Sequence, residues 1–137
     1  MKIAIDGPAG SGKSTVAKKL SKTLSIPYLD TGSLYRAFGY IAKKKAINLN
    51  SIKEVLSLFE EDIKVELRIA CMRVLYQGRE IGEEIRTEEI GRYASILGSY
   101  PEFRERINEF FRKLVGDSQV VAEGRDVGTH IFPDAPI

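Results

Sequence analysis

The residue types best suited to chemistry form a glycine-rich segment near the N-terminus. Residues 7–14 read Gly-Pro-Ala-Gly-Ser-Gly-Lys-Ser and match the pattern G-x-x-x-x-G-K-[ST] without a gap. Glycines let backbone N–H groups and the N-terminus of a following helix surround phosphate oxygens. Lys13 would neutralise the β and γ phosphates of a nucleotide, Ser14 would join a Mg²⁺ shell, and Thr15 would lie near the α phosphate. The predicted phosphate-binding residues are Gly7, Pro8, Ala9, Gly10, Ser11, Gly12, Lys13, Ser14 and Thr15.

The elements around this segment predict a parallel sheet. Residues 3–5 read as a short buried strand, and a helix is expected from Gly12 onward, with apolar residues at helical spacing. A second strand is expected at 26–30, followed by a helix that ends in the basic run 43–45. This alternation predicts a sheet covered by helices, with ligands at the carboxyl ends of its strands. The apolar residues expected on the buried face of the first helix are Val16, Ala17, Leu20 and Leu24.

A later apolar strand, residues 120–122, continues into the polar residues 123–126. In a parallel sheet this continuation should emerge at the same end as the glycine-rich segment. Two helices are expected before this strand, one capped by Thr87 and one opened by Pro101, and Gly116 is expected to end the second.

The spacing of apolar residues changes in the middle of the chain. Residues 52–59 have apolar positions typical of a short amphipathic helix, whereas 63–68 and 71–76 alternate with period two. We therefore expect a small antiparallel insert at about 62–86 within a single domain, residues 1–137. Cys71 is expected to be packed in this insert rather than reactive.

Composition limits the class of protein. The chain has 137 residues, 43% of them hydrophobic and 29% charged, which is typical of one globular domain. A net charge of +2 with mixed signs gives no broad basic face for nucleic acid. A single cysteine, no apolar run of membrane-spanning length and no signal-peptide pattern indicate a reduced, cytoplasmic protein without membrane contact.

Four segments of the chain resemble the bacterial cytidylate kinases. Besides the glycine-rich segment, residues 28–37 (YLDTGSLYRA) are similar to the Asp-[Thr/Ser]-Gly-x-x-Tyr-Arg segment of that family. Further similarity runs through 84–90, 94–95 and 100–104, and then through 122–129 into 132–136. The resemblance implies an α/β fold of the P-loop nucleoside monophosphate kinase type, with a parallel sheet, flanking helices and a small antiparallel monophosphate-binding insert.

The resemblance also implies roles for individual residues. The family transfers the γ-phosphoryl of Mg·ATP to CMP or dCMP, giving CDP or dCDP in pyrimidine nucleotide metabolism. Arg36 and Arg125 would hold the acceptor phosphate, which suits bidentate guanidinium groups, and with Lys13 they would form the catalytic set. Glu123 would lie near Mg²⁺ together with Ser14. The implied CMP-binding residues are Thr31, Tyr35, Arg36, Ser95, Arg104, Arg125 and Asp126.

Structural roles remain alternatives for several of these residues. Either arginine could pair with a nearby carboxylate, Ser95 and Arg104 could belong to solvated helix faces, and Glu123 could cap a turn.

The family continues beyond the last matching segment into a fourth strand, an arginine-rich lid helix and further elements, which are expected to be absent here. Full-length members are monomeric, but loss of those strands would leave residues 3–5 as an exposed edge. The sequence therefore predicts that this chain self-associates. A catalytically incompetent nucleotide-binding fragment is the alternative to an active kinase.

Two other functions are compatible with a phosphate-binding segment of this kind. A kinase of the same fold acting on shikimate or a deoxynucleoside is disfavoured by the insert and by the residues implied for CMP. A GTPase-type switch is disfavoured because the sequence has neither an Asp-x-x-Gly nor an Asn-Lys-x-Asp motif.

Overall fold

The computed structural model describes residues 2–7, 12–125 and 127–131 and divides into two compact units. The first unit comprises Met1–Gly32, Val65–Arg73 and Asn108–Ile137, and the second comprises Ser33–Lys64 and Val74–Ile107. None of the helices in the described ranges is long and apolar enough to cross a membrane.

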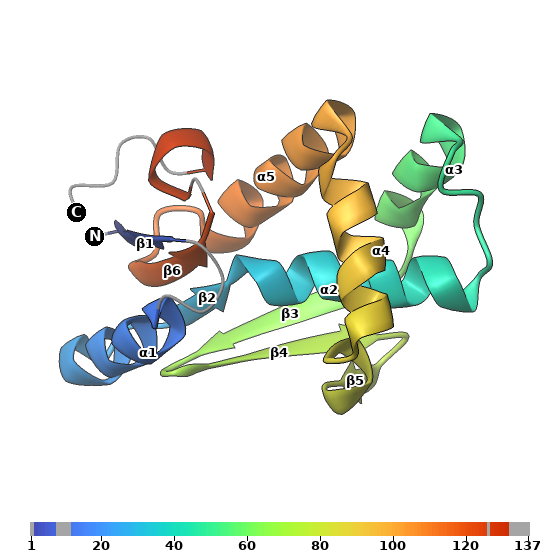
Figure 1. Cartoon of the computed structure of the whole chain (residues 1–137). Helices are drawn as coiled ribbons and strands as arrows, with labels where there is room; N and C mark the ends of the chain where they lie inside the picture. The colour runs from blue at the N-terminus through green and yellow to red at the C-terminus, as the bar shows by residue number, and fades with distance from the viewer. Residues whose placement is uncertain (1, 8–11, 126, 132–137) are drawn as a thin grey trace. The chain divides into compact units, whose positions relative to one another are not determined.

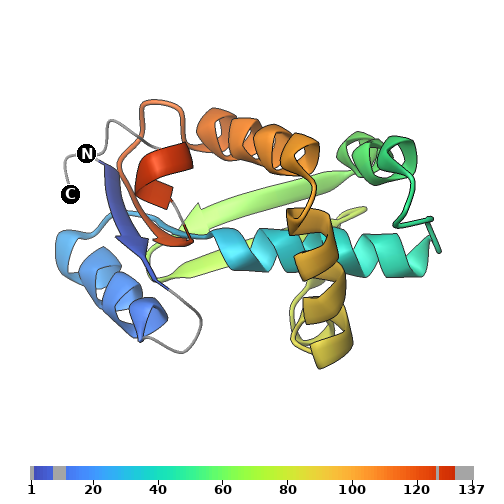
Figure 2. The same cartoon turned by 45° about the horizontal axis from the view of Figure 1, so that its top comes forward.

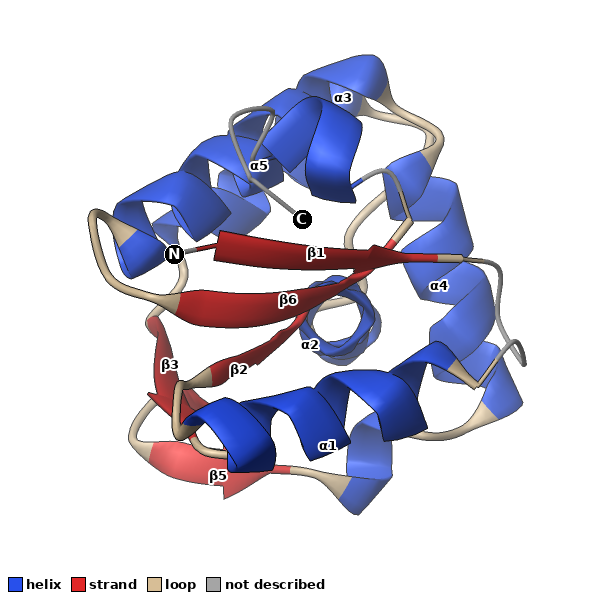
Figure 3. Cartoon of the chain, turned by 90° about the vertical axis from the view of Figure 1, so that its left-hand side faces the viewer, coloured by secondary structure: helices blue, strands red, loops and turns tan. Residues whose placement is uncertain are grey.

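The first unit is built on a parallel sheet of three strands. Its order is β1 (Lys2–Asp6), β6 (Val120–Gly124) and β2 (Tyr28–Asp30), and β1 lies at an edge of the sheet within the described residues. Figure 3 shows these strands side by side, with α1 (Lys13–Leu24) along one side. The central strand β6 is buried at all five positions, as expected for a strand paired on both sides. The parallel sheet with flanking helices confirms the predicted fold class.

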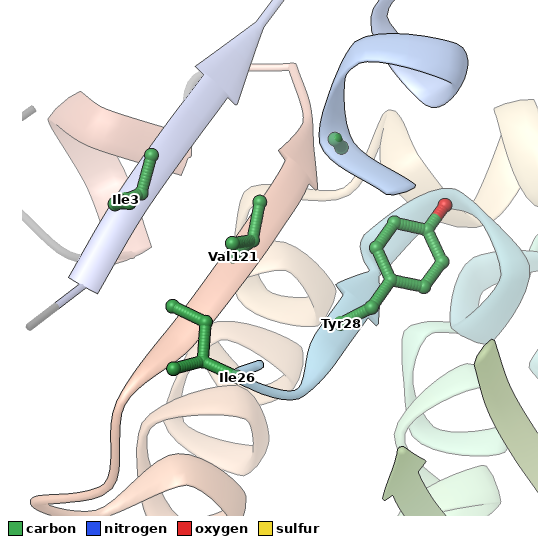
Figure 4. Packing of buried hydrophobic residues seen from close by; sticks show 5 residues of the cluster. Ile3, Ile26, Tyr28 and Val121 are labelled. Carbon is green, nitrogen blue, oxygen red and sulfur yellow. The ribbon is translucent and has the colours of Figure 1, made fainter. Parts of the chain in front are cut away.

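The core of the first unit joins the sheet to α1. Ile3, Ala17, Ile26, Tyr28 and Val121 form one buried cluster, in which the Tyr28 ring extends from β2 and carries its hydroxyl away from Ile26 (Figure 4). Burial of such side chains contributes roughly 1.5–3 kcal/mol each, so this cluster fixes the helix against the strands.

One part of the prediction for α1 is wrong. Val16 and Leu24 are 50% and 44% exposed, whereas Ala17 and the polar Ser21 are fully buried. Ser21 is satisfied there because its hydroxyl donates to the Ile26 carbonyl at 2.5 Å and accepts from the Ala70 amide at 2.8 Å. The buried face is therefore centred on the 17–21 turn, and the apolar residues on either side of it face solvent.

The second unit holds most of the helices. Here α2 (Thr31–Lys44, beginning in the first unit) is crossed by α4 (Glu88–Gly98), coloured cyan and gold in Figures 1 and 2. A Cβ added at Gly39 would lie 3.1 Å from the Tyr93 Cβ and 3.2 Å from the Ala94 amide nitrogen. Glycine at this position thus permits the close crossing of the two helices.

An aromatic cluster forms the centre of the second unit. Phe103 of α5 (Pro101–Val115) lies with its ring centroid 4.9 Å from Phe59, 5.6 Å from Phe38 and 5.9 Å from Tyr35. Phe38 and Phe103 are almost completely buried. Tilted and edge-on rings at these separations are favourable arrangements, so the cluster holds α2 and the start of α5 together.

The ends of α4 and α5 agree with the residues predicted to begin or end these helices. The Thr87 hydroxyl accepts from the Ile90 amide at the start of α4, and Pro101 opens α5. Gly116 follows α5 with a φ of 56°, a left-handed conformation that glycine adopts without strain. These boundaries confirm the predictions for Thr87, Pro101 and Gly116.

The predicted helix over 52–59 is shorter than expected. The structure has α3 (Ile52–Leu56) followed by a 3₁₀ turn at Ser57–Glu60. The Ser57 hydroxyl donates to the Glu54 carbonyl at 2.5 Å, and such side-chain bonds to the backbone compete with helix continuation.

The antiparallel insert is present, with one strand more than predicted. Its sheet has the order β3 (Ile63–Arg68), β4 (Cys71–Tyr76) and β5 (Arg79–Ile81). Gln77 and Gly78 both have positive φ, 53° and 79°, which suits the tight turn between β4 and β5. The division into units runs through this sheet, since 65–73 belongs to the first unit and 74–86 to the second. The domain prediction, one domain with an insert at 62–86, stays a prediction.

The expectation that Cys71 is packed is wrong. Cys71 is exposed, whereas Val74 and Tyr76 of the same strand are buried. Alternation along β4 places Cys71 on the face opposite to these two residues.

Candidate functional site

Gly7, the first residue of the glycine-rich segment, and the polar end of β6 lie at one end of the parallel sheet. In the register of β1 with β6, Ile5 lies opposite Glu123 and Asp6 opposite Gly124. The Gly7 amide donates to the Gly124 carbonyl at 3.2 Å, so pairing continues into the first residue of the phosphate-binding pattern. Asp30 of β2 also lies opposite Glu123. Pro8, Ala9, Gly10 and Ser11 lie outside the described residues.

The first helix begins at this same end of the sheet. Gly12, at the N-cap of α1, has a φ of 81°, and the first turn of α1 contains no acidic residue. Lys13 is half-buried, whereas Ser14 and Thr15 are exposed. A helix N-terminus whose first turn contains no acidic residue favours a bound anion such as phosphate.

Glu123 places a buried carboxylate beside this helix. The residue is 3% exposed, and its Oε1 accepts a hydrogen bond from the Ser14 hydroxyl at 2.8 Å. The same oxygen accepts a short hydrogen bond from the Tyr28 hydroxyl, which itself lies 3.4 Å from the Ser14 Oγ. Three oxygens from α1, β2 and β6 therefore lie together at the end of the sheet.

These oxygens fit the predicted magnesium site. Mg²⁺ prefers oxygen ligands and is usually held by one or two protein groups together with substrate phosphates and water. No cluster of three or more His, Cys, Asp or Glu residues occurs among the described residues, so they do not form an all-protein cage for a metal. Ser14 and Glu123 are the residues that would hold the ion, which would screen the charge of the transferring phosphoryl group.

The segments around Glu123 are fixed by backbone hydrogen bonds. The Thr31 hydroxyl donates to the Glu123 carbonyl at 2.9 Å, and Thr31 is 4% exposed. The Asp6 carboxylate, at the end of β1, accepts hydrogen bonds from the Val127 amide at 2.6 Å and the Gly128 amide at 3.1 Å. These two amides lie at the start of a π-helical turn, Val127–Ile131. The strand that leads into the glycine-rich segment thus also anchors the chain that follows Arg125.

The second unit contains an open pocket of about 630 Å³. Arg36 lies at this pocket, and its Nη1 donates to the Ile85 carbonyl at 3.0 Å and the Thr87 carbonyl at 3.2 Å. Because both partners are carbonyls, these contacts leave the guanidinium charge unneutralised and able to attract an anion. The residues that line the pocket are Arg36, Glu88, Gly91, Arg92, Ser95 and Ile96.

Tyr35 and Arg104 lie in the same unit. Burial raises the pKa of Tyr35 to about 12, opposed by the positive charge of Arg104. Arg104 itself is exposed on α5. Tyr35 thus remains an uncharged hydroxyl at neutral pH, next to a cationic side chain.

The predicted residues fall into two groups according to unit. The described residues of the phosphate-binding pattern, Thr31, Glu123 and the exposed Arg125 belong to the first unit. Tyr35, Arg36, Ser95 and Arg104 belong to the second, where Arg36 and Ser95 share the pocket. Asp126 lies outside the described residues. The roles assigned to all of these residues stay predictions.

Sequence reasoning missed three residues at these sites. Arg92 lines the pocket three positions before Ser95, a helical spacing that places both on one face of α4. Tyr28 and Asp6 contact the Glu123 carboxylate and the 127–128 backbone, respectively. Tyr28 shares a strand face with Asp30 two positions later, a signal that could have placed it near the end of the sheet.

Tyr28 gives the first unit a predictable response to alkaline pH. Burial, the negative charge of Asp30 and the hydrogen bond to Glu123 raise the pKa of the Tyr28 hydroxyl above the ordinary value of 10.0. Because the pKa is raised on folding, the associated stability is fully present below pH 10 and is lost as pH rises towards the folded-state pKa.

We expect the free energy of unfolding to fall above pH 10, with Tyr28 contributing up to about 1.4 kcal/mol per pH unit. Urea unfolding at several pH values between 8 and 11 would measure it. The Tyr28→Phe variant should show a shallower decline than the unchanged chain, and parallel curves for the two proteins would contradict the prediction.

Comparison with known proteins identifies the family of this chain. A family model described as cytidylate kinase matches residues 3–137. Proteins named cytidylate kinase from Aquifex aeolicus (strain VF5) and Desulfitobacterium hafniense (strain Y51) are 50% and 43% identical to this chain over 138 residues, and both matches cover 100% of it. They cover 61% and 59% of those relatives, so the chain spans about three fifths of their length. The chain belongs to the cytidylate kinase family.

Proposed function

We propose that this chain carries the Mg·ATP site and acceptor-binding residues of a cytidylate kinase. The reaction is transfer of the γ-phosphoryl group of ATP to CMP or dCMP, giving ADP and CDP or dCDP. The names of the relatives and the family match support this reaction. A cytoplasmic location and the absence of nucleic-acid or membrane partners stay predictions.

The observation that carries the proposal is the 2.8 Å contact between Ser14 and Glu123. Both residues were predicted near Mg²⁺ from segments at opposite ends of the sequence. The fold places them at the carboxyl end of a parallel sheet, beside the N-terminus of α1, where ligands of such sheets bind. Lys13 on the same turn would neutralise phosphate charge.

The residues proposed for the acceptor are those that the family resemblance implies. Arg36 and Arg125 are proposed to bind the monophosphate, each by a planar guanidinium that pairs with two phosphate oxygens. Ser95, Arg104 and Asp126 are proposed to read the cytosine edge, with Thr31 and Tyr35 close to the bound nucleotide. Since phosphoryl transfer depends on positioning and charge neutralisation, no dedicated general base is required.

The alternative function is nucleotide binding without turnover. Like the reaction above, it is a proposal for this chain, which spans about three fifths of the length of its relatives. A fragment of this kind would bind ATP or CMP but release no ADP.

A coupled assay of ADP formation tests the proposal directly. The chain is incubated with Mg·ATP and, in turn, CMP, dCMP, UMP, AMP or shikimate. We expect turnover with CMP and dCMP, and a Lys13→Ala variant should lose activity about 100-fold or more because a phosphate-neutralising charge is removed.

The matched control is Lys19→Ala, which removes an exposed lysine from the same helix and should leave turnover unchanged. Measurable ATP and CMP binding without ADP release would support the alternative instead. Absence of binding of both nucleotides would contradict both functions.

Self-association is the second part of the proposal. Within the described residues β1 pairs on one side only, with β6, and an open strand edge is a template for pairing with another chain. We expect sedimentation velocity to show dimers or larger species that dissociate on dilution. A folded monomer at all concentrations would contradict this part without affecting the catalytic one.

A further inference from the structure

Tyr28 holds a position that the proposed chemistry does not assign. It is 2% exposed on β2, next to the central strand β6, and its ring belongs to the buried cluster of the first unit. Only its hydroxyl leaves that apolar cluster, and it donates to Glu123 Oε1. A buried phenol needs a hydrogen-bond partner, and here the partner is the carboxylate predicted to lie near the metal.

Glu123 has two hydroxyl donors of different kinds. Ser14 is exposed in the first turn of α1, and its oxygen is itself a predicted metal ligand. Tyr28 is fixed by packing, so its hydroxyl has little freedom to follow any other group. If Ser14 turns towards a metal ion, Tyr28 remains as the donor that fixes the Glu123 carboxylate.

We propose that Tyr28 is a positioning residue that orients the Glu123 carboxylate for the divalent metal bound with the nucleotide. The inference rests on the proposed Mg·ATP site and adds a residue to it. Hydrogen-bond partners behind a metal-binding carboxylate fix its direction, and their loss commonly weakens metal binding 10–100-fold.

The test separates metal-dependent binding from nucleotide binding in general. A fluorescent ATP analogue is titrated into the chain in Mg²⁺ and in EDTA, and the ratio of the two affinities is taken as the contribution of the metal. We expect Tyr28→Phe to lower this ratio about tenfold while the affinity in EDTA stays within about twofold. A purely structural role would weaken binding equally in both conditions.

The chain offers a matched control. Tyr76 is also buried, and its hydroxyl donates to a carboxylate oxygen of Glu61 at 2.8 Å; both residues belong to the second unit, whereas Ser14 and Glu123 belong to the first. Tyr76→Phe removes the same kind of hydrogen bond and should leave the ratio unchanged. Equal losses in the two variants would overturn the inference.

Making the Tyr28→Phe substitution in a Glu123→Asp variant shows whether Tyr28 acts through Glu123. Glu123→Asp keeps the charge but shortens the side chain, so its carboxylate no longer reaches the phenol in the same way. Tyr28→Phe should have little further effect on the ratio in this background. An undiminished effect would mean that Tyr28 acts by another route, which overturns the inference.

The outcomes also distinguish this inference from the proposed function. If the unchanged chain binds the ATP analogue in neither condition, the proposed function fails and the inference falls with it. If the unchanged chain shows metal-dependent binding that Tyr28→Phe leaves intact, only the inference is overturned.

Discussion

Replacing Gly124 with alanine is expected to destabilise the first unit by about 2–3 kcal/mol. A Cβ at this position would lie 1.9 Å from the Thr31 Oγ1 and 3.1 Å from the Val127 Cγ2. Thr31 cannot move away cheaply, because its hydroxyl donates to the Glu123 carbonyl in a buried location. Relief of the clash would therefore shift the end of β6 together with Glu123 and Arg125. Urea unfolding measures the loss of stability, and titration with Mg·ATP measures the accompanying loss of affinity.

A double-mutant cycle identifies the clash as the cause. Thr31→Ala alone should cost about 1 kcal/mol, since one hydrogen bond is lost. Combined with Gly124→Ala, it removes the atom at 1.9 Å, so the second substitution should cost much less than in the unchanged chain. Gly82→Ala is the matched control, because a Cβ there meets nothing within 4 Å. Additive losses in the cycle would refute the steric explanation.

Replacing Phe103 with alanine should have the largest effect on the second unit, about 3–5 kcal/mol of unfolding free energy. Phe103 is completely buried and contacts the rings of Tyr35, Phe38 and Phe59. The substitution leaves a cavity where α2 and α5 meet, and the three remaining rings lose their common partner. Chemical denaturation followed by circular dichroism would measure the change.

The losses of stability in two further variants are compared with that of Phe103→Ala. Phe103→Leu keeps most of the buried volume and should cost clearly less than alanine. Glu102→Ala changes the exposed neighbour on the same helix and should stay within about 0.5 kcal/mol of the unchanged chain. A loss below about 1 kcal/mol for Phe103→Ala would show that the cluster does not determine the stability of this unit.

The sequence predicted the parallel sheet well because its signals are local. Strand and helix alternate twice along the first 45 residues, and this order allows few topologies. Local sequence patterns could not predict that β6 lies between β1 and β2, because the order of strands in a sheet depends on pairing between distant segments. The strand β5 was missed because only three residues form it after the Gln77–Gly78 turn.

The spacing of apolar residues predicted the wrong buried face where a polar residue is buried. On α1 the apolar pattern alone could not show that Ser21 faces the core, because its hydrogen bonds to Ile26 and Ala70 arise only in the folded chain. The same limit applies to the candidate site. Motifs identified Ser14 and Glu123, whereas the hydrogen bond from Tyr28 to Glu123 depends on the pairing of β2 with β6, which local sequence patterns do not show.

The pairing of β1 with β6 also sets the time at which the first unit can form. Lys2 lies opposite Val120, so the strand that leads into the glycine-rich segment meets its partner only after residue 120 has been synthesised. Contacts between such distant segments close slowly, whereas α2, α4 and the aromatic cluster involve residues nearer one another in the chain. The second unit can therefore fold during synthesis before the end of the sheet beside the glycine-rich segment is assembled.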